Sequence, residues 1–467
     1  MNEEEEAGVV DGQQSGAPAH AAVPGWPAGA GLPALRGHNT ALVLDLLRVA
    51  GTAGISRREL ADRTGLTPQA VSKITARLRT EGLAAPAGRR ASTGGKPPTA
   101  LRLVPGARFA VGLHLDRDAC TAVLADLTGT VVAERHGPLD LGAGAGEVVD
   151  LVVREVRALT EAAGRSAAAQ QPAAAQRPGT AQPPGAAPAV LGVGVAAPGP
   201  LDHRLGVLHR VTGFPEWDGF PLRDVLARRL GLPVAVDKDT NAAALGLSLS
   251  TDLGPSGVDS FAYLHLGTGL GAGLVLDGAV RRGARTGAGE FGHQVILLDG
   301  PLCSCGNHGC VEALCLDAAA RGDLAGAARV LGEGAANLTA LLDVDRVLLG
   351  GATINSGAVT GERFVRGVAA VLAERAGRTG RDPAVPVALA PGGPRAVAEG
   401  AAQLLLAPLF GRAPSIPAVS AMPTAAATPA VSATPAAAAT PAASATPAEP
   451  AMPPEPAAPA ASPTPAD

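Results

Sequence analysis

Hydrophobic and polar positions in the N-terminal part of the chain predict a series of short helices. Leucine, valine and alanine recur at helical spacing over residues 39–50, and Gly51 ends the run. A second helix is predicted from Ser56, because a serine followed three residues later by Glu59 forms a capping box, and Gly65 ends this helix.

A third helix is predicted from Thr67, which caps it with Pro68 in the first position, and Gly82 ends it. Apolar residues at three- and four-residue spacing give this helix one buried face. Two short helices joined at a glycine, the second with a polar free face, are typical of a helix-turn-helix. The side chains expected on that free face are Gln69, Ser72, Lys73, Thr75, Arg77 and Arg79.

A β-hairpin is predicted next, over residues 83–90 and 92–103, and would form the wing of a winged helix. Polar groups near the start of the third helix can reach base edges, while basic residues beside glycine and proline in a wing suit a minor groove. The alternative is a three-helix domain that binds protein, because helical periodicity alone shows only a core. Capping, basic face and wing together favour DNA, and the predicted contact residues are Gln69, Ser72, Lys73, Arg77, Arg79, Arg89, Arg90 and Lys96.

The hydrophobic period shortens after the hairpin, where alternating residues predict strands over 110–116, 120–127 and 131–136. Helical spacing returns over 148–159. Mixed strands and helices of this kind predict an α/β domain. The predicted parts of the chain are a disordered tail (1–36), a winged helix-turn-helix (37–107), the α/β region (108–411) with a low-complexity surface insertion (165–189), and a disordered tail rich in Ala, Pro and Thr (412–467). The family resemblance given below implies that the α/β region divides into a small lobe (108–245) and a large, zinc-containing lobe (246–411).

Composition and charge add two constraints. Aromatic residues make up only 2% of the 467 residues, so the core must be built from valine, leucine and alanine. The net charge of −4 makes no general case for nucleic acid, but residues 36–108 hold thirteen Lys and Arg against four Asp and Glu, a local balance of +9. Glutamates at 3–6 stand where a signal peptide needs basic residues, and no apolar run is long enough to span a bilayer, so a soluble cytoplasmic protein without a membrane partner is expected.

Four good metal ligands lie close together in the sequence between residues 289 and 312. One imidazole and three thiolates form a closed tetrahedral set of the kind that holds structural zinc, with no open position for a metal-bound water. A redox or disulfide cluster is the alternative, although such spacing in a reducing cytosol more often indicates metal. The predicted zinc ligands are His293, Cys303, Cys305 and Cys310.

Glycines, metal ligands and acidic residues from Leu266 to Glu312 follow one another in a register that resembles the signature of the ROK family, which contains sugar kinases and sugar-responsive repressors such as the xylose and N-acetylglucosamine repressors. Residues 37–104 resemble the winged helix of its repressors. The resemblance implies an α/β fold in which an N-terminal winged helix-turn-helix precedes an actin-like ATPase (ribonuclease H-like) domain of two lobes, of the sugar-kinase type. It also implies a long helical segment after Glu312, which we expect to be shortened by several turns here.

The nucleotide-binding elements of the family are altered in this chain. Residues 114–119 stand where ROK kinases carry D-x-G-x-T-K, and they place Asp116 and Asp118 where a polyphosphate would lie. Like charges about 4 Å apart repel by a few kcal/mol under surface-like screening, so ATP is not expected to bind. A second phosphate-binding turn is retained, although such a turn is also simply a tight hairpin. This nucleotide remnant comprises Gly267, Thr268, Gly269 and Gly271.

The sugar site implied by the resemblance includes Asp239, the general base of the kinases, which is a vestigial base here and has helix N-capping as its alternative role. Lys238 replaces a sugar-binding asparagine, so a group that donates and accepts becomes a donor only. His293 could bind zinc through one ring nitrogen while the other faces the ligand. The predicted sugar-binding residues are Lys238, Asp239, Asn241, Glu290, His293 and Glu312.

These features predict a sugar-responsive DNA-binding transcriptional regulator of carbohydrate metabolism genes, a repressor rather than an enzyme, with structural zinc. Its expected partners are double-stranded operator DNA, a sugar or sugar phosphate effector, and further copies of itself in a homodimer or higher homo-oligomer. One alternative is an ATP-dependent, glucokinase-like sugar kinase with an attached DNA-binding domain. Another is a constitutive DNA-binding protein whose sugar site is vestigial.

Overall fold

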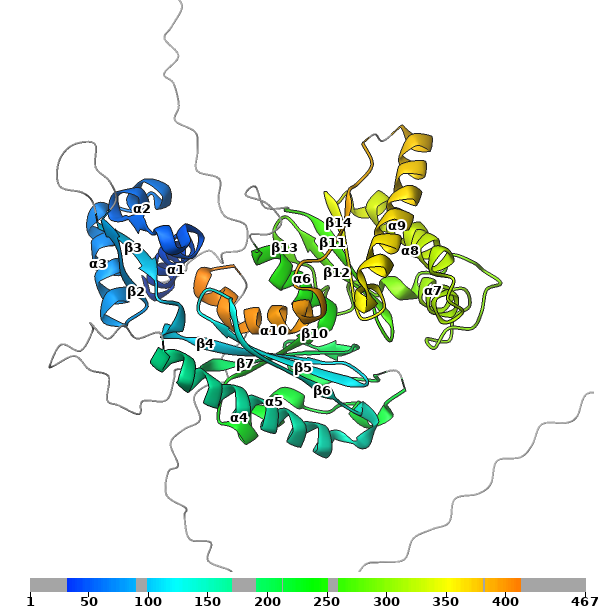
Figure 1. The fold of residues 1–467 in the computed structure, drawn as a ribbon, viewed down its shortest axis with the longest axis horizontal. Helices are drawn as coiled ribbons and strands as arrows, with labels where there is room; N and C mark the ends of the chain where they lie inside the picture. Colours follow the sequence, from blue (N-terminus) through cyan, green and yellow to red (C-terminus); the bar gives the residue numbers. More distant parts are fainter. Residues whose placement is uncertain are drawn as a thin grey trace, which may run out of the picture. The chain divides into compact units, whose positions relative to one another are not determined.

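The computed structural model describes residues 32–89, 99–169, 190–211, 213–250, 259–380 and 383–412 (Figure 1). The predicted tails and low-complexity insertion fall largely outside these ranges, as do Arg90 and Lys96, and of Arg89 only the backbone is described. Within the described ranges, no helix has both the length and the apolar character needed to cross a bilayer.

The first helix, α1 (Leu32–Ala50), begins seven residues before its predicted start. Pro33 lies in its first turn, where a missing N–H costs nothing, so the proline does not stop the helix from extending. The second helix, α2 (Arg57–Thr64), has the predicted capping box: the backbone N–H of Glu59 donates to Ser56 Oγ (3.2 Å), and that of Ser56 donates to Glu59 Oε2 (2.8 Å).

The third helix, α3 (Pro68–Thr80), starts as predicted, with Thr67 Oγ1 accepting from the N–H of Ala70 (3.2 Å). The prediction that Thr75 is exposed is wrong. Its side chain is fully buried beside Val71 and Leu78, because the hydroxyl donates to the carbonyl of Val71 (2.8 Å) and so needs no water. The predicted wing hairpin is present as part of a three-stranded sheet of β1 (Ile55–Ser56), β3 (Thr99–Leu103) and β2 (Ala84–Arg89), in that order.

The small lobe is built on a five-stranded sheet with the order β10-β7-β4-β5-β6. Figure 1 shows α4 (Ala145–Ala169) and α5 (Leu222–Leu230) on one face of this sheet and α10 (Ala396–Leu406) on the other. The predicted 148–159 helix is therefore longer than its apolar stripe indicated. The strands are β4 (Phe109–Leu115), β5 (Ala119–Asp126), β6 (Val131–Pro138), β7 (Val190–Ala197) and β10 (Val234–Lys238), with a small hairpin of β8 (Leu201–Asp202) and β9 (Val207–Leu208) beside them.

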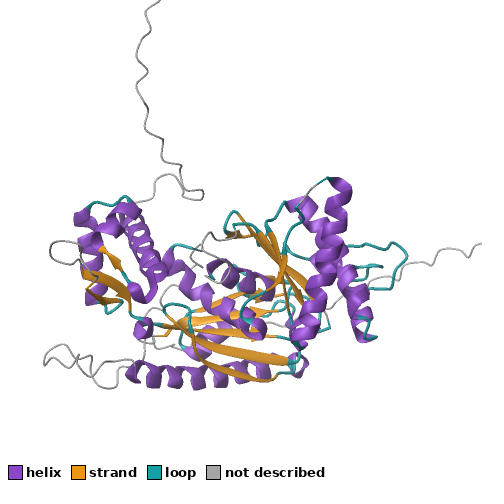
Figure 2. Cartoon of the chain, turned by 45° about the horizontal axis from the view of Figure 1, so that its top comes forward, coloured by secondary structure: helices purple, strands orange, loops and turns teal. Residues whose placement is uncertain are grey.

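The large lobe contains a second five-stranded sheet with the order β13-β12-β11-β14-β15. Figure 2 shows both larger sheets in orange, each flanked by helices. Two helices, α7 and α8, stand where a shortened segment was expected after Glu312. The elements of this lobe are β11 (Phe261–Leu266), β12 (Leu270–Leu276), β13 (Ala279–Val280), α7 (Val311–Ala320), α8 (Leu324–Leu342), β14 (Arg346–Gly350), α9 (Ala358–Thr379) and β15 (Val387–Leu389).

Helix α6 (Asp239–Leu249) connects the two lobes by packing on α10 and on β12. The close approach of α6 and α10 depends on glycine. A Cβ on Gly400 would lie 1.9 Å from the carbonyl oxygen of Ala242, and one on Gly246 would lie 2.8 Å from the Cα of Gly400. At the far end of α6, Arg48 of α1 donates to the carbonyl of Leu249 (3.4 Å).

Candidate ligand pocket and metal centre

The cysteine loop lies between a short 3-10 turn, Phe291–His293, and the start of α7. The loop folds back on itself through isolated bridges that pair Val295 with Cys310 and Leu302 with His308. Gly309 is required at its close approach: it has a φ of +66°, and a Cβ there would lie 1.6 Å from the carbonyl oxygen of Leu297.

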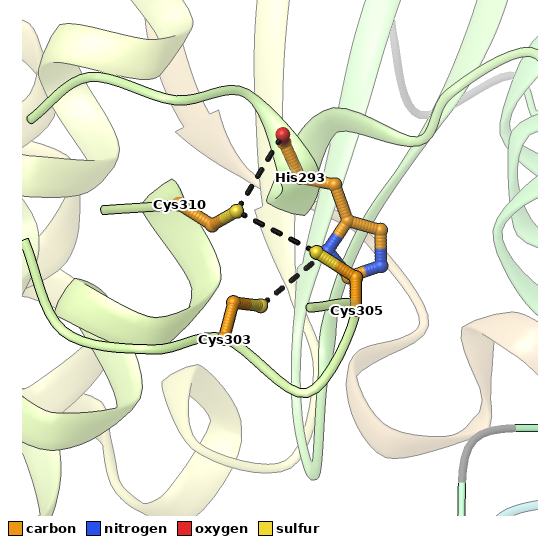
Figure 3. Close-up of side chains that lie close together, drawn as sticks. All are labelled: His293, Cys303, Cys305 and Cys310. Atoms are coloured by element: carbon orange, nitrogen blue, oxygen red, sulfur yellow. Dashed lines mark hydrogen bonds between the residues drawn. The ribbon is translucent and has the colours of Figure 1, made fainter. Parts of the chain in front are cut away.

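This folding brings the four predicted metal ligands together, so that their ligand atoms all lie within 4.8 Å of one another (Figure 3). His293 Nδ1 lies 3.7 Å from the sulfur of Cys303, and the sulfurs of Cys305 and Cys310 are 3.7 Å apart. Two thiolates at about 2.3 Å from a tetrahedral ion are separated by roughly 3.8 Å, whereas a disulfide would need about 2.05 Å. The donor set and its spacing therefore suit a tetrahedral metal ion.

A cleft of about 100 Å³ opens beside this cluster, between the end of β10 and the cysteine loop (residues 294–310). Its walls combine residues from both lobes, and most of the predicted ligand-binding and nucleotide-remnant residues are among them. The predicted residues that line it are Asp116, Lys238, Asp239, Thr268, Gly269, Gly271, Glu290, His293 and Glu312. Three further lining residues, Arg117, His265 and Ser304, were not predicted from the sequence.

His293 belongs both to the cluster of metal ligands and to the wall of the cleft. Its Nδ1 faces the sulfur of Cys303, whereas its Nε2 lies 4.0 Å from Glu290 Oε2 on the pocket side. Glu312, near the start of α7, accepts through Oε2 from the N–H of Leu270 (2.8 Å). The imidazole and both carboxylates thus reach the cleft from the two segments that flank the cysteine loop.

The end of β10 and the first residue of α6 carry two of the predicted sugar-binding side chains. Lys238 is only 5% exposed, and its Nζ donates to Glu290 Oε1 and to the carbonyl oxygen of Ala288, each at 2.9 Å. Asp239 lines the cleft as the first residue of α6, where its Oδ1 accepts from the backbone N–H of Thr240 (2.6 Å); the N-cap position itself belongs to Lys238, which makes no side-chain cap hydrogen bond.

Asn241 does not reach the cleft. It is fully buried within the first turn of α6, where its Nδ2 donates to Asp237 Oδ1 (3.1 Å). Asp237 also accepts from Arg282 (2.6 Å), in an ion pair with side-chain exposures of 2% and 14%. Sequence analysis missed this pair; the available signal was an acidic residue inside the buried run of β10.

The altered turn between β4 and β5 places Asp116, but not the exposed Asp118, on the cleft. Asp116 Oδ1 accepts from Thr268 Oγ1 (3.1 Å), so the hydroxyl group of the retained glycine turn is already hydrogen-bonded to a carboxylate. Arg117 also lines the cleft and lies over the ring of Phe214 (5.8 Å).

Beneath this turn, His114 is buried against His265, with ring centroids 6.1 Å apart. Burial, and secondarily the neighbouring His265, lowers the pKa of His114, so its imidazole is neutral near pH 7. Among the described residues its Nε2 has no hydrogen-bond partner. At this end of the cleft the carboxylate of Asp116 disfavours a polyphosphate, the guanidinium of Arg117 is the neighbouring cation, and the neutral ring buried beneath them adds no charge.

Comparison with known families agrees with this geometry. Residues 43–83 match a family described as winged helix-turn-helix DNA-binding, and residues 181–327 match the ROK family. The chain carries a ROK family domain behind a winged helix-turn-helix. The predicted fold class is thereby confirmed, and a solved ROK family transcriptional regulator, described as a homologue of the E. coli MLC protein, shares this fold with a TM-score of 0.58 at 23% identity over 81% of this chain and 97% of that one.

The curated relatives include proteins named as repressors and proteins named as sugar kinases. The chain is 30% identical over 258 residues to a xylose repressor of Caldicellulosiruptor bescii, a match that covers 55% of this chain and 59% of that protein. It is 41% identical over 123 residues to a glucokinase of Thermotoga maritima, which covers 26% of this chain and 38% of the glucokinase. The chain therefore spans only part of the length of the relatives it matches.

Proposed function

We propose that the protein is a sugar-responsive DNA-binding transcriptional regulator, a repressor of carbohydrate metabolism genes. The observation that carries the proposal is the joining, in one chain, of an exposed recognition helix to a pocket walled by hydroxyl-binding carboxylates. On α3 the side chains of Gln69, Ser72 and Lys73 are exposed at the N-terminal end, where a recognition helix meets base edges. Xylose repressors among the relatives support the same assignment.

The proposed effector is a sugar or sugar phosphate held by Asp239, Glu290 and Glu312. Carboxylates accept hydrogen bonds from several hydroxyls at once, and His293 Nε2 adds a further polar group on the same wall. We propose zinc for the His293, Cys303, Cys305 and Cys310 cluster, because three thiolates and one imidazole are a donor set that it prefers. The ion would fix the cysteine loop and leave the chemistry of recognition to the side chains.

In the proposed mechanism the effector shifts the equilibrium between two arrangements of the lobes. A ligand that binds one arrangement of the two lobes more tightly favours that arrangement, and it weakens operator binding if the paired winged helices then no longer match their half-sites. Two half-sites require two winged helices, so we propose that the protein acts as a homodimer or higher homo-oligomer.

Fluorescence anisotropy with DNA from the promoter of the protein's own gene tests the proposal. Addition of D-xylose, D-glucose, N-acetylglucosamine or its 6-phosphate is expected to weaken DNA binding by about tenfold for at least one of them, a typical coupling strength. Binding that ignores every sugar would favour the constitutive DNA-binding alternative.

A sugar kinase is the second candidate, favoured by Asp239 at the cleft and by the glucokinase match. The carboxylate of Asp116, which accepts from the hydroxyl of Thr268 on the retained turn, weighs against it. Incubation with ATP and D-glucose decides between them: turnover near the ordinary enzymatic range of about 1–1000 per second would establish the kinase.

Changing Lys73 to alanine is expected to weaken DNA binding while leaving the fold intact, because this side chain is exposed on α3. If Lys73 contacts a phosphate, the slope of log affinity against log salt should fall by about one. Arg366→Ala, on the exposed face of α9, serves as the matched control. An unchanged affinity and salt slope would remove α3 as the recognition helix.

A further inference from the structure

One loop of the large lobe makes three polar connections to the small lobe. This loop, residues 281–290, follows β13 and leads to the metal-binding His293. Arg282 pairs with Asp237 of β10 (2.6 Å), and Thr286 Oγ1 lies 2.8 Å from the Nδ1 of His203 in the turn after β8. The third connection is made by Lys238, the last residue of β10.

Lys238 extends across the cleft past Gly199, where a Cβ would crowd the Lys238 Cδ at 3.0 Å. Its Nζ also passes close to Gly289. The ammonium then reaches Glu290 Oε1 and the carbonyl oxygen of Ala288, at 2.9 Å each. The side chain is thus enclosed along its length and ends on two acceptors of the opposite lobe.

Those two acceptors face the same cleft that we assign to the effector. A carboxylate and a backbone carbonyl accept hydrogen bonds from ligand hydroxyls in the same way as from an ammonium. Lys238 therefore makes, from within the chain, contacts of the type that a sugar hydroxyl would make to this wall.

The two ion pairs between β10 and the loop differ in exposure. Asp237 and Arg282 are 2% and 14% exposed, so their pair is a fixed part of the interior. Glu290 is 50% exposed although its partner Lys238 is only 5% exposed, and its Oε2 also lies 4.0 Å from His293 Nε2. Water and solutes can reach Glu290, so its pair with Lys238 can exchange for a different partner.

We propose that Lys238 is a built-in occupant of the effector cleft, which links the two lobes when no effector is bound and determines which ligands enter. A ligand must displace the ammonium from Glu290 and Ala288 with its own hydroxyl donors. The part of the ligand that does so carries neutral hydroxyl groups, because the acceptors that it meets on this wall, Glu290, Asp239 and Glu312, are carboxylates. This inference rests on the proposed function for the identity of the ligand, but not for the link itself.

The link can be measured without any ligand, because the chain contains only three lysines, Lys73, Lys96 and Lys238. Amine-reactive labelling of the full chain, read by mass spectrometry of peptides, compares the enclosed Lys238 with the exposed Lys73 in the same sample. Lys238 is expected to react at least about fivefold more slowly than Lys73, and Glu290→Gln should remove most of that difference. Glu362→Gln, an exposed glutamate on α9, is the matched control and should change nothing.

Equal reactivity of Lys238 and Lys73 in the unaltered protein would overturn the link, and so would Lys238 protection that survives Glu290→Gln. Lys73 labelling must stay constant throughout, which distinguishes a local change from general unfolding.

Calorimetry with D-xylose and D-glucose then tests the role in specificity. Lys238→Asn removes the occupant and supplies an amide that both donates and accepts, so this variant is expected to bind at least one of the two sugars about tenfold more tightly than the unaltered protein. Binding that is equal or weaker would show that Lys238 contacts the ligand instead of competing with it, and would overturn the specificity role. If neither protein binds a sugar and DNA binding ignores all of them, the proposed sensing function fails, while the labelling still decides whether the lobes are linked.

Discussion

Replacing Cys310 with serine is expected to abolish metal binding and effector response while leaving DNA binding intact. The sulfur of Cys310 lies among the four ligand atoms, and the residue directly precedes α7 and Glu312. Structural zinc contributes about 10–16 kcal/mol of apparent binding free energy in small zinc peptides, so loss of one thiolate should release the loop. Metal content measured by mass spectrometry should fall from about one ion per chain to almost none.

Cys315→Ser is the matched control for this experiment. Cys315 is buried on α7, five residues from Cys310, where its sulfur faces the carbonyl of Ala327 (3.4 Å), and it is not among the cluster ligands. This variant should keep its metal. Hydrogen exchange should rise over residues 294–310 in Cys310→Ser only, while the exchange of α2 and α3 stays unchanged. A Cys310→Ser protein that retains one ion per chain would contradict the assignment of this thiol as a ligand.

Replacing Arg282 with alanine is expected to destabilise the ROK domain by about 3–5 kcal/mol, the usual cost of leaving a buried charge without its partner. Asp237 is 2% exposed, and without the guanidinium it would keep only the N–H of Lys238 and the amide of Asn241 as donors. Urea unfolding of the variant, followed by circular dichroism, measures this loss as a lower midpoint.

The neighbouring residue supplies the control. Arg281 pairs with Asp277 at the surface, with side-chain exposures of 48% and 87%, so Arg281→Ala should cost less than about 1 kcal/mol. The two adjacent arginines are thus expected to differ several-fold in the free energy of unfolding that is lost when each is replaced with alanine. Equal unfolding midpoints for the two variants would show that the buried pair is not a major source of stability.

Local chemistry made the winged helix predictable in detail. The capping box of Ser56 and Glu59 and the cap of Thr67 depend only on residues a few positions apart, so the starts of α2 and α3 could be derived from the sequence. The start of α1 and the length of α4 were wrong, because a helix continues beyond its apolar stripe wherever no residue stops it. Thr75 was misplaced because periodicity cannot show a hydroxyl that is satisfied within its own helix.

The pocket was only partly predictable for a different reason. Residues close in sequence, such as the ligands of the cysteine loop, are brought together by local folding. The spacing of such residues along the chain is therefore enough to indicate their role. The contacts of Asp116 with Thr268 and of Lys238 with Glu290 join residues 152 and 52 positions apart, across two lobes. No periodic pattern encodes such pairs, so the ion pairs that connect the lobes became visible only in the folded chain.

Helix α6 has two ends in different parts of the molecule. Asp239, at its first turn, lines the cleft, and the carbonyl of Leu249, at its last, accepts a hydrogen bond from Arg48 of the winged helix. Eleven residues of α-helix span about 16 Å and bend little over that length. A tilt of this helix at the cleft would therefore also move the carbonyl that Arg48 contacts, so α6 provides one direct mechanical connection between the pocket and the DNA-binding domain.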